Sequence, residues 1–299
     1  MDFYEWYDRS LVEAHQHNVP KYELEYLAIS LLGLTKLDLR LRSPNIEVQI
    51  DSQKLIKLDQ AWQERCRDRV PVQYLIGSVI WRDLELQVSP AVLIPRPETE
   101  LIIDIAADFI NQNNQSLIYQ KGDWLDLGTG SGAIAIALAK MLPQSQIYAV
   151  DISESALELA KENAYRNMLT NQQINFYLGN YFEPISQLNL QNKFVGMISN
   201  PPYIPSFEVL NLQPEVVNHE PHLALSGGDD GLDAIRELVN TAPNYLISQG
   251  FWIIELMSGQ ASIVRSLLLD NGCYGNIEIH QDYAGIERFV SAQMTKPMM

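Results

Sequence analysis

Strand-like and helix-like segments alternate from Trp124 to the C-terminus, and this alternation constrains the fold more than any other feature of the sequence. Short apolar segments typical of strands lie at residues 124–127, 146–150, 174–178, 194–199, 250–256, 276–280 and 287–290. Segments with helical periodicity lie at residues 132–142, 153–166, 231–241 and 260–271. This pattern predicts an α/β fold with a mostly parallel sheet covered by helices on both faces. The last two strands have no helix between them, so we expect them to pair antiparallel at one end of the sheet.

The first 75 residues predict a separate, small helical domain. Apolar residues recur at helical spacing around Leu11 and form a dense stretch across residues 26–32. Asp51 is a suitable N-cap for a third helix. Few β-branched residues occur in runs here, so we expect residues 1–75 to contain no sheet.

Short alternating segments predict a β-hairpin linker at residues 76–95, and the α/β domain then occupies residues 96–299. Pro95 and Pro97 exclude a regular helix or a central strand at the junction. We expect Thr99 to cap the helix that follows.

The charge of the chain is strongly acidic and unevenly distributed. Among 299 residues there are 21 Lys and Arg against 37 Asp and Glu, a formal net charge of −16. The segment up to Leu75 has 10 basic and 12 acidic residues, whereas the segment from Ile76 onward has 11 basic and 25 acidic ones, a net of −14. Such a balance argues against a protein that binds nucleic acid directly along a broad basic face.

The sequence also indicates a reducing compartment. Cys66 and Cys273 are 207 residues apart and form neither a disulfide framework nor a metal knuckle. The N-terminus lacks the basic start and apolar core of a secretory signal, and no apolar run is long enough for a membrane span. We therefore expect a cytoplasmic protein without membrane contact. Its oligomeric state is not set by the sequence, and a monomer is the expectation.

A glycine-rich turn joins the first strand of the α/β domain to the next helix. It reads Asp126-Leu127-Gly128-Thr129-Gly130-Ser131-Gly132. Alternate glycines allow a tight turn and let a ligand approach the backbone closely. On the next strand, Asp151 lies 23 residues after Gly128, where a carboxylate can accept hydrogen bonds from both hydroxyls of a ribose. The pair predicts a nucleoside-containing cofactor.

Three interpretations of this turn remain open from the residues alone. The spacing is compatible with the dinucleotide variant of the motif, in which a helix N-terminus faces a pyrophosphate. It suits S-adenosylmethionine better, because Asp126 can face the cationic amino-acid end of that cofactor. A turn with a purely structural role is the third possibility.

A second motif, Asn200-Pro201-Pro202-Tyr203, follows the fourth strand. Consecutive prolines make the turn rigid and leave carbonyl groups without partners. The side-chain carbonyl of Asn200 and the backbone carbonyl of Pro201 could accept both hydrogens of a planar –NH₂ group, and Tyr203 could cover that group with a flat face. These acceptors would orient a poorly nucleophilic amide or base amine toward a methyl sulfonium. The alternative is a proline-rich turn that only ends a strand.

Together the two motifs resemble the S-adenosylmethionine-dependent amino-methyltransferases. Three further segments, at residues 71–77 (Pro-Val-Gln-Tyr-Leu-Ile-Gly), 93–100 (Leu-Ile-Pro-Arg-Pro-Glu-Thr-Glu) and 220–232, resemble more specifically the HemK-type protein-glutamine methyltransferases. Those enzymes modify the glutamine of the Gly-Gly-Gln motif in peptide-chain release factors. The resemblance covers essentially the whole chain. It implies a Rossmann-like methyltransferase sheet at residues 96–299, a helical substrate-docking domain at residues 1–75 and a hairpin linker between them.

The resemblance also implies roles for individual residues. Residues Gly128 to Gly132 would wrap the methionine part of the cofactor, and Asp151 would hold its ribose. Asn200 would contact cofactor and substrate, and Asn200 through Tyr203 would seat the glutamine amide. Near the adenine the family usually has Asp-Trp before a Phe, whereas this chain has Asn180-Tyr181, which lacks the charge and offers a smaller stacking surface.

Competing functions are distinguished by features of the sequence. An adenine amino-methyltransferase acting on nucleic acid shares the Asn-Pro-Pro-Tyr chemistry, but it needs a basic, aromatic-lined recognition domain. A non-catalytic binding module would not need an intact turn at Asn200. His219 and His222 superficially suggest a metal site, but Pro221 breaks the helix required and no third ligand is evident, so we expect no metal.

Overall fold

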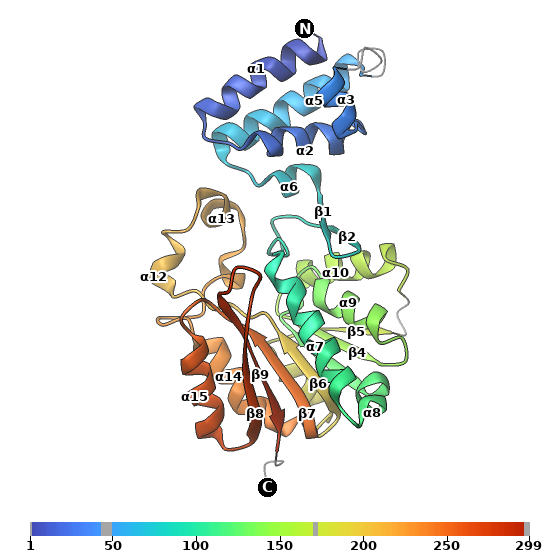
Figure 1. The fold of residues 1–299 in the computed structure, drawn as a ribbon, viewed down its shortest axis with the longest axis vertical. Coiled ribbons are helices and arrows are strands. Elements are labelled where there is room, and N and C mark those ends of the chain that lie inside the picture. Colours follow the sequence, from blue (N-terminus) through green and yellow to red (C-terminus); the bar gives the residue numbers. More distant parts are fainter. Residues whose placement is uncertain (1, 43–49, 170–172, 296–299) are drawn as a thin grey trace. The chain divides into compact units, whose positions relative to one another are not determined.

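The computed structural model describes residues 2–42, 50–169 and 173–295, and its chain divides into two compact units (Figure 1). The helical unit comprises Met1–Ser78 together with Leu212–Glu220. The sheet unit comprises Val79–Asn211 together with Pro221–Met299. A segment from the second half of the sequence thus belongs to the N-terminal unit.

The N-terminal helices of the helical unit pack around aromatic and leucine side chains, and α13 (Pro214–His219) joins them through ion pairs. The N-terminal helices are α1 (Phe3–Gln16), α2 (Lys21–Leu32), α3 (Lys36–Leu41), α5 (Ser52–Gln63), a π-helical turn η1 (Glu64–Asp68) and α6 (Val72–Ile76). Asp51 caps α5 by accepting a hydrogen bond from the Lys54 N–H at 2.8 Å, which confirms the predicted cap. Trp6 and Trp62 are fully buried, and the Trp6 indole donates to Asp59 at 2.8 Å.

Buried charges hold α13 within the helical unit. Arg65 pairs with Glu23 of α2 and, at 2.9 Å, with Glu215 of α13. Arg69 also pairs with Glu215, at 2.6 Å. The Arg65 side chain is only 4% exposed, so loss of one partner would leave an uncompensated buried charge. This network fixes the segment 212–220 to the helical unit.

The sheet unit begins with a hairpin and is built on a seven-stranded sheet. The hairpin consists of β1 (Ser78–Trp81) and β2 (Leu84–Gln87). The large sheet consists of β3 (Asp123–Leu127), β4 (Ile147–Asp151), β5 (Ile174–Leu178), β6 (Phe194–Ser199), β7 (Leu246–Glu255), β8 (Tyr274–Gln281) and β9 (Glu287–Met294). Its order is β5-β4-β3-β6-β7-β9-β8, with β9 antiparallel to both neighbours and the other pairs parallel. The predicted α/β class and the antiparallel end pair are confirmed.

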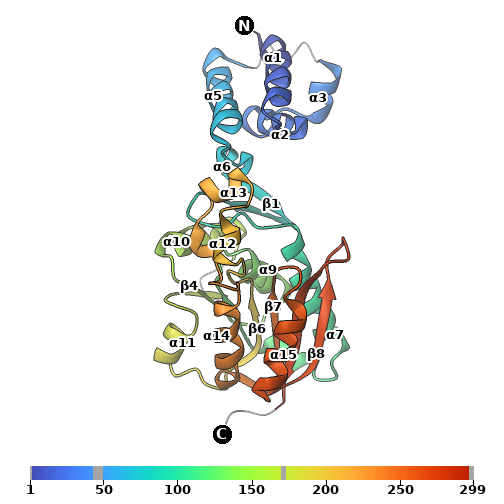
Figure 2. The ribbon, with the colours of Figure 1, turned by 90° about the vertical axis from the view of Figure 1, so that its left-hand side faces the viewer.

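Helices cover both faces of the large sheet (Figures 1 and 2). One layer contains α7 (Leu101–Gln112), α8 (Ser116–Lys121), α9 (Ala133–Met141) and α10 (Glu154–Arg166), and the opposite layer contains α11 (Glu183–Gln187), α14 (Asp233–Thr241) and α15 (Ala261–Asn271). Successive residues of β3 face opposite layers: Trp124 packs against the first and Leu125 against the second. Shorter elements are α12 (Ser206–Val209) and the 3₁₀ turns η2 (Glu98–Glu100), η3 (His222–Ala224) and η4 (Ala242–Asn244).

The direction of the strand order reverses between β3 and β6. The chain adds β4 and β5 on one side of β3 and then returns to add β6 on the other side. Leu127 and Ser199 end these two strands as register partners, and the Ser199 hydroxyl donates to the Leu127 carbonyl at 2.6 Å. Ligands of open α/β sheets bind at such a reversal point, beyond the carboxyl ends of the strands. The topology therefore brings together two turns that are far apart in sequence.

The expected role of Thr99 as a helix cap is wrong. Residues Glu98–Glu100 form η2, and α7 begins at Leu101 with Glu100 at the cap position and no side-chain cap. Thr99 is 4% exposed and its hydroxyl accepts a hydrogen bond from Asn200. The side chain is used in a tertiary contact, which local sequence statistics cannot reveal.

Candidate active site

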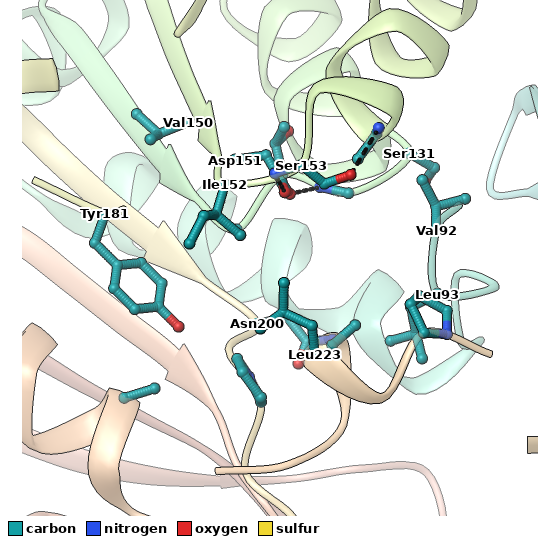
Figure 3. Close-up of a pocket in the computed structure, with 18 of the residues that line it drawn as sticks. Val92, Leu93, Ser131, Val150, Asp151, Ile152, Ser153, Tyr181, Asn200 and Leu223 are labelled. Carbon is teal, nitrogen blue, oxygen red and sulfur yellow. Dashed lines mark hydrogen bonds between the residues drawn. The ribbon is translucent and has the colours of Figure 1, made fainter. Parts of the chain in front are cut away.

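A cavity of about 450 Å³ opens at the reversal point of the sheet, and all of its walls belong to the sheet unit (Figure 3). Predicted site residues that line it are Gly128, Thr129, Gly130, Ser131, Asp151, Asn180, Tyr181, Asn200 and Pro202. Residues 91–93 and Leu223 add apolar walls. Asp126, Gly132, Pro201 and Tyr203 do not line it.

The glycine-rich turn is held by backbone hydrogen bonds to the neighbouring strand. Gly128 and Thr129 donate their N–H groups to the Val150 carbonyl at 2.9 and 3.0 Å. The buried side chain of Asn163 on α10 also supports the turn, because it donates to the Ser131 carbonyl at 2.9 Å. Apart from the two chain neighbours, no heavy atom of the described residues lies within 4 Å of the point where a Cβ would sit on Gly130, so this part of the turn faces open space. Such a cradle fits a ligand that approaches the backbone closely.

Asp151 links the turn to the next helix. Its Oδ2 accepts from the Gly130 N–H at 2.8 Å, and its Oδ1 accepts from the Ser153 N–H at 2.9 Å. Burial raises the pKa of Asp151, and these hydrogen bonds from backbone N–H groups oppose the rise. A carboxylate oxygen can accept more than one hydrogen bond, so both oxygens retain capacity for two ribose hydroxyls.

Asp126 lies beneath the turn rather than in the cavity wall. It is fully buried, and its Oδ2 accepts from the Thr129 hydroxyl at 2.6 Å. Its Oδ1 has no hydrogen-bond partner among the described residues. Burial raises the pKa of Asp126 to about 7, with a smaller contribution from the charge of Asp151. A contact with the cationic end of a cofactor stays a prediction for this residue.

The Asn-Pro-Pro-Tyr turn places Asn200 beside the glycine-rich turn. A Cβ added to Gly128 would lie 3.9 Å from the backbone carbonyl oxygen of Asn200. The Nδ2 of Asn200 donates to the Thr99 hydroxyl at 3.3 Å, which leaves Oδ1 as the amide atom available to a substrate. Tyr203 instead packs against the core of α14 and α15 and donates its hydroxyl to Glu255 Oε1 at 3.1 Å. The predicted stacking of Tyr203 on a substrate is therefore not evident in this arrangement and stays a prediction.

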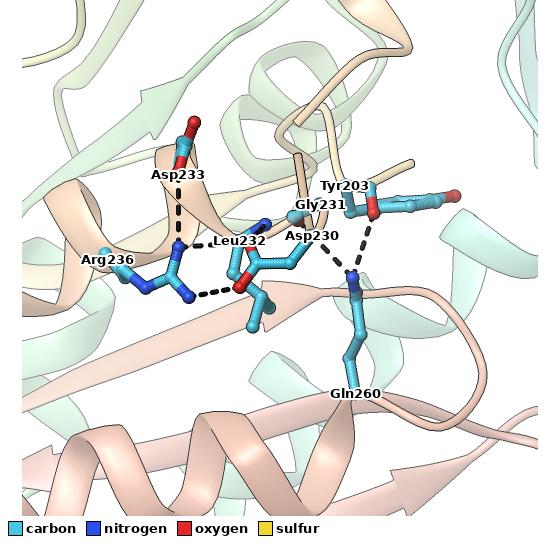
Figure 4. Close-up of polar contacts among 7 residues, drawn as sticks. All are labelled: Tyr203, Asp230, Gly231, Leu232, Asp233, Arg236 and Gln260. Carbon is cyan, nitrogen blue, oxygen red and sulfur yellow. Dashed lines mark hydrogen bonds and ion pairs between the residues drawn. The ribbon is translucent and has the colours of Figure 1, made fainter. Parts of the chain in front are cut away.

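The side chain of Gln260 connects the Asn-Pro-Pro-Tyr turn to the segment around Gly231 (Figure 4). Gln260 Nε2 donates to the Tyr203 carbonyl at 2.9 Å and to the Gly231 carbonyl at 3.3 Å, while its Oε1 accepts from the Met257 N–H at 2.9 Å. Arg236 closes the same segment by pairing with Asp230. These contacts fix the position of the Asn-Pro-Pro-Tyr turn. A fixed position is what a group that orients a substrate requires.

Glu255, at the end of β7, is a buried acidic residue that the sequence interpretation did not include in the site. It is 1% exposed, and burial raises its pKa to about 7. The hydrogen bond from the Tyr203 hydroxyl, the proximity of the Thr99 hydroxyl and the charge of Arg288 oppose the rise. Its Oε2 makes no hydrogen bond of ordinary length to a described residue. The signal that could have identified it is its position at the carboxyl end of a central strand, which it shares with Asp151.

The far end of the cavity is lined by Asn180, Tyr181 and Glu237. Tyr181 has a left-handed backbone (φ 40°), and burial raises the pKa of its hydroxyl. Burial also raises the pKa of Glu237, and the nearby side-chain amide of Asn180 opposes this rise. The sequence interpretation did not include Glu237, because it lies within the helix α14, after the segment 220–232 has ended. An aromatic ring beside hydrogen-bonding groups suits a purine.

The described part of the chain holds neither a metal-binding cluster nor a membrane-spanning helix. Among residues 2–42, 50–169 and 173–295, no group of three His, Cys, Asp or Glu residues is arranged to hold a metal ion. Within the same ranges no helix has the length and apolar character needed to cross a membrane.

Comparison with known proteins places these features in a family. Residues 120–226 match a family model described as a methyltransferase domain. The chain is 44% identical to the release factor glutamine methyltransferase of Synechocystis sp., over 98% of this chain and 96% of the relative. It is 45% identical to that of Thermosynechococcus vestitus, over 95% of each chain. The crystal structure of a methyltransferase from Pyrococcus furiosus, 14% identical, matches with a TM-score of 0.52 over 82% of this chain and all of that one, which supports the fold.

Proposed function

Because the chain belongs to the family of release factor glutamine methyltransferases, we propose that it methylates the side-chain amide nitrogen of the glutamine in the Gly-Gly-Gln motif of peptide-chain release factors. The observation that carries this proposal is the junction of two turns at the reversal point of the sheet. There Asn200 lies beside the glycine cradle and keeps Oδ1 available. Nothing in the described structure or the comparisons favours the nucleic-acid alternative.

The cavity fits S-adenosylmethionine. The open side of Gly130 offers room for the methionine part, Asp151 retains acceptor capacity for the ribose, and Tyr181 offers a ring for the adenine. This cofactor supplies an electrophilic methyl group on a sulfonium when it is bound. Val92, Leu93 and Leu223 contribute apolar side chains to the wall of the same cavity.

Asn200 and the following proline perform the chemical task that remains. An amide nitrogen is a poor nucleophile because its lone pair is delocalised into the carbonyl group. Oδ1 of Asn200 and the carbonyl of Pro201 accept its two hydrogens, hold it in place and favour pyramidal geometry at nitrogen. Positioning of this kind contributes up to roughly 7–11 kcal/mol in the best intramolecular cases. The proton leaves the nitrogen after methyl transfer, so no dedicated base is assigned.

We also propose that residues 1–75 dock the protein substrate. Their net charge is near neutral, and the helical unit exposes large apolar side chains, Tyr22 and Ile56 among them, at 67% and 57%. Replacing Tyr22 and Ile56 by Ser should raise KM for a whole release factor. KM for a short Gly-Gly-Gln peptide should not change, because the peptide lacks the docking surface. Equal KM values for the variant and the wild type on the whole factor would exclude this surface.

The function is tested by incubating the pure protein with methyl-labelled S-adenosylmethionine and a release factor, then mapping the label by peptide mass spectrometry. We expect one methyl group on the Gly-Gly-Gln glutamine. The matched control is the same factor with that glutamine replaced by glutamate, which removes the amide. A parallel reaction contains nucleic acid. Label on adenine, or no label on the glutamine, would contradict the proposal.

A further inference from the structure

The Asn-Pro-Pro-Tyr turn depends on a neighbouring segment for its position. Its two prolines have no N–H group, so the carbonyl groups of the turn need hydrogen-bond donors from elsewhere. The turn lies against residues 227–231 (Gly-Gly-Asp-Asp-Gly), which we call the glycine segment. A Cβ on Gly227 would lie 2.6 Å from the Pro202 carbonyl oxygen, and a Cβ on Gly231 would collide with the Tyr203 carbonyl oxygen. This close approach therefore requires glycine at both positions.

One buried side-chain amide joins the turn to the glycine segment. Gln260, which is 5% exposed, donates from Nε2 to the carbonyls of Tyr203 and Gly231, at 2.9 and 3.3 Å (Figure 4). Its Oε1 accepts from the Met257 N–H at 2.9 Å. An amide has two N–H hydrogens, so both are used. The reversed amide would place its oxygen against two carbonyl oxygens and its nitrogen against an N–H group. Only one orientation of the side chain satisfies these contacts.

Both segments that this amide joins contribute to the cavity wall. Asn200 and Pro202 line the cavity from the turn, and Gly227 and Gly228 line it from the glycine segment. Gln260 lies outside the wall, at the N-cap position of α15. This position follows β7, whose parallel neighbour β6 leads into the turn. A displacement of the Gln260 amide would therefore move Asn200 relative to the rest of the cavity.

Resting on the proposed function, we propose that Gln260 is a positioning residue for methyl transfer, because it fixes the Asn-Pro-Pro-Tyr turn relative to the cavity that would hold the cofactor. It contacts neither reacting group and acts through the backbone of Tyr203, three residues after Asn200. Methyl transfer needs a short and aligned approach of the two reacting atoms. A displacement of about 1 Å can lower a rate by roughly 100-fold. The contribution of Gln260 is to prevent such a displacement.

The first test is Gln260→Glu, which keeps the shape and one oxygen but loses both N–H donors. At about pH 9 the ionised carboxylate repels the two carbonyl oxygens, and the single-turnover rate with a release factor should be about 10- to 100-fold below the wild type. A neutral carboxyl has an O–H group that can donate to the Tyr203 carbonyl. The ratio of the variant rate to the wild-type rate should therefore rise as pH falls to about 6, because burial raises the pKa of a carboxyl.

Two further readouts separate positioning from stability. KM for the release factor and the Kd for S-adenosylmethionine should stay near those of the wild type, since the glycine-rich turn and Asp151 are unchanged. Gln144→Glu, the same change at an exposed position, is the control and should keep the wild-type rate at every pH. A wild-type rate in folded Gln260→Glu, even with a lower Tm, would overturn the proposal. A rate deficit that does not change with pH would also overturn it.

The second test displaces the same contact from the other side, and it decides the question if Gln260→Glu fails to fold. Gly231 and Gly285 both have φ 76°, so alanine strains the two backbones alike. A Cβ on Gly231 would meet the Tyr203 carbonyl and, at 2.8 Å, Gln260 Nε2. Within the described chain, a Cβ on Gly285 would have no heavy atom within 4 Å except in its chain neighbours.

Both alanine variants should have a lower Tm, but only Gly231→Ala should lower the single-turnover rate. Equal rates in Gly231→Ala and Gly285→Ala would overturn the proposal. Failure of the proposed function would differ, because then the wild type itself would leave the glutamine unlabelled.

Discussion

The backbone N–H of Gly130 donates to Oδ2 of Asp151 at 2.8 Å, so the acidic residue that ends β4 closes the glycine-rich turn that follows β3. The same carboxylate accepts from Ser153 at the start of α10. A single side chain thereby shapes the cradle and presents acceptors to the cavity. This double role makes Asp151 the most informative residue for tests of cofactor binding.

Asp151→Ala should weaken binding of S-adenosylmethionine by about 10- to 100-fold, the loss of one or two charge-assisted hydrogen bonds. Asp151→Asn should lose less, because its carbonyl still accepts one hydrogen bond. Isothermal titration of each variant measures the Kd. Asp270→Asn, an exposed change far from the cavity in sequence, is the control and should match the wild type. Unchanged affinity in Asp151→Ala would remove this residue from the ribose site.

Asn200→Ala should reduce kcat by at least about 100-fold, because the substrate amide loses a fixed acceptor. Cofactor affinity should be weakened only slightly, since the glycine cradle and Asp151 remain. Single-turnover kinetics and cofactor titration separate the two effects. Asn211→Ala, which removes an exposed amide after α12, should leave both unchanged. Full activity of Asn200→Ala would refute the amide-orienting mechanism.

The two glycines of the cradle should respond differently to alanine. Both have left-handed backbones, at φ 54° for Gly130 and 84° for Gly132, so each substitution costs about 1–2 kcal/mol of strain. A Cβ on Gly132 would also lie 3.1 Å from the Ala160 Cβ and 3.2 Å from the Ile136 Cδ1. Gly132→Ala should therefore lower Tm more than Gly130→Ala does. Gly130→Ala should mainly raise the cofactor Kd, because its methyl group enters the cavity. The reverse ranking of Tm values would contradict this account of the turn.

Asp126 should make the stability of the sheet unit depend on pH. In the folded chain its pKa is about 7, whereas in the unfolded chain it is near the ordinary value of about 3.9. Between these two pKa values the folded state binds the proton of Asp126 more tightly than the unfolded state does. The protonated carboxyl therefore stabilises the folded state at low pH, and this contribution is lost as pH rises toward 7. The free energy of unfolding of Asp126→Asn, relative to that of the wild type, should rise by on the order of 2–4 kcal/mol between pH 4 and pH 8. Urea unfolding at both values measures the change, with Asp270→Asn as an exposed control; no change between the two pH values would be the contrary result.

Tyr181 should contribute to adenine binding through its ring and not through its hydroxyl. Tyr181→Ala should weaken cofactor binding by about 0.5–1.5 kcal/mol, the usual value of an aromatic contact. Tyr181→Phe should bind like the wild type, and Tyr181→Trp, which restores the larger surface common in the family, should bind more tightly. Titration calorimetry of the three variants provides the comparison. Equal affinity of the alanine and phenylalanine variants would exclude stacking here.

Local patterns were sufficient to predict most of the sheet unit. Apolar runs separated by helical segments identified the strands, because the hydrophobic periodicity of a strand or a helix appears among neighbouring residues of the sequence. The glycine-rich turn and the Asn-Pro-Pro-Tyr turn were recognisable because both need particular residues at adjacent positions. Thr99 was misassigned, because a threonine before a helix has the same local signal whether or not its hydroxyl caps the helix.

The sequence by itself therefore determined the α/β class, the two turns and the acidic character of residues 76–299. Only the tertiary structure decided what lies behind Asn200. Thr99, which accepts a hydrogen bond from Asn200, lies 101 residues before it, and Glu255, which accepts from Tyr203, lies 52 residues after that tyrosine. The same holds for segment 212–220, which belongs to the helical unit through the buried pairing of Arg65 with Glu215. Hydrogen bonds and ion pairs between distant residues depend on topology and burial, and neither has a period or a spacing along the chain.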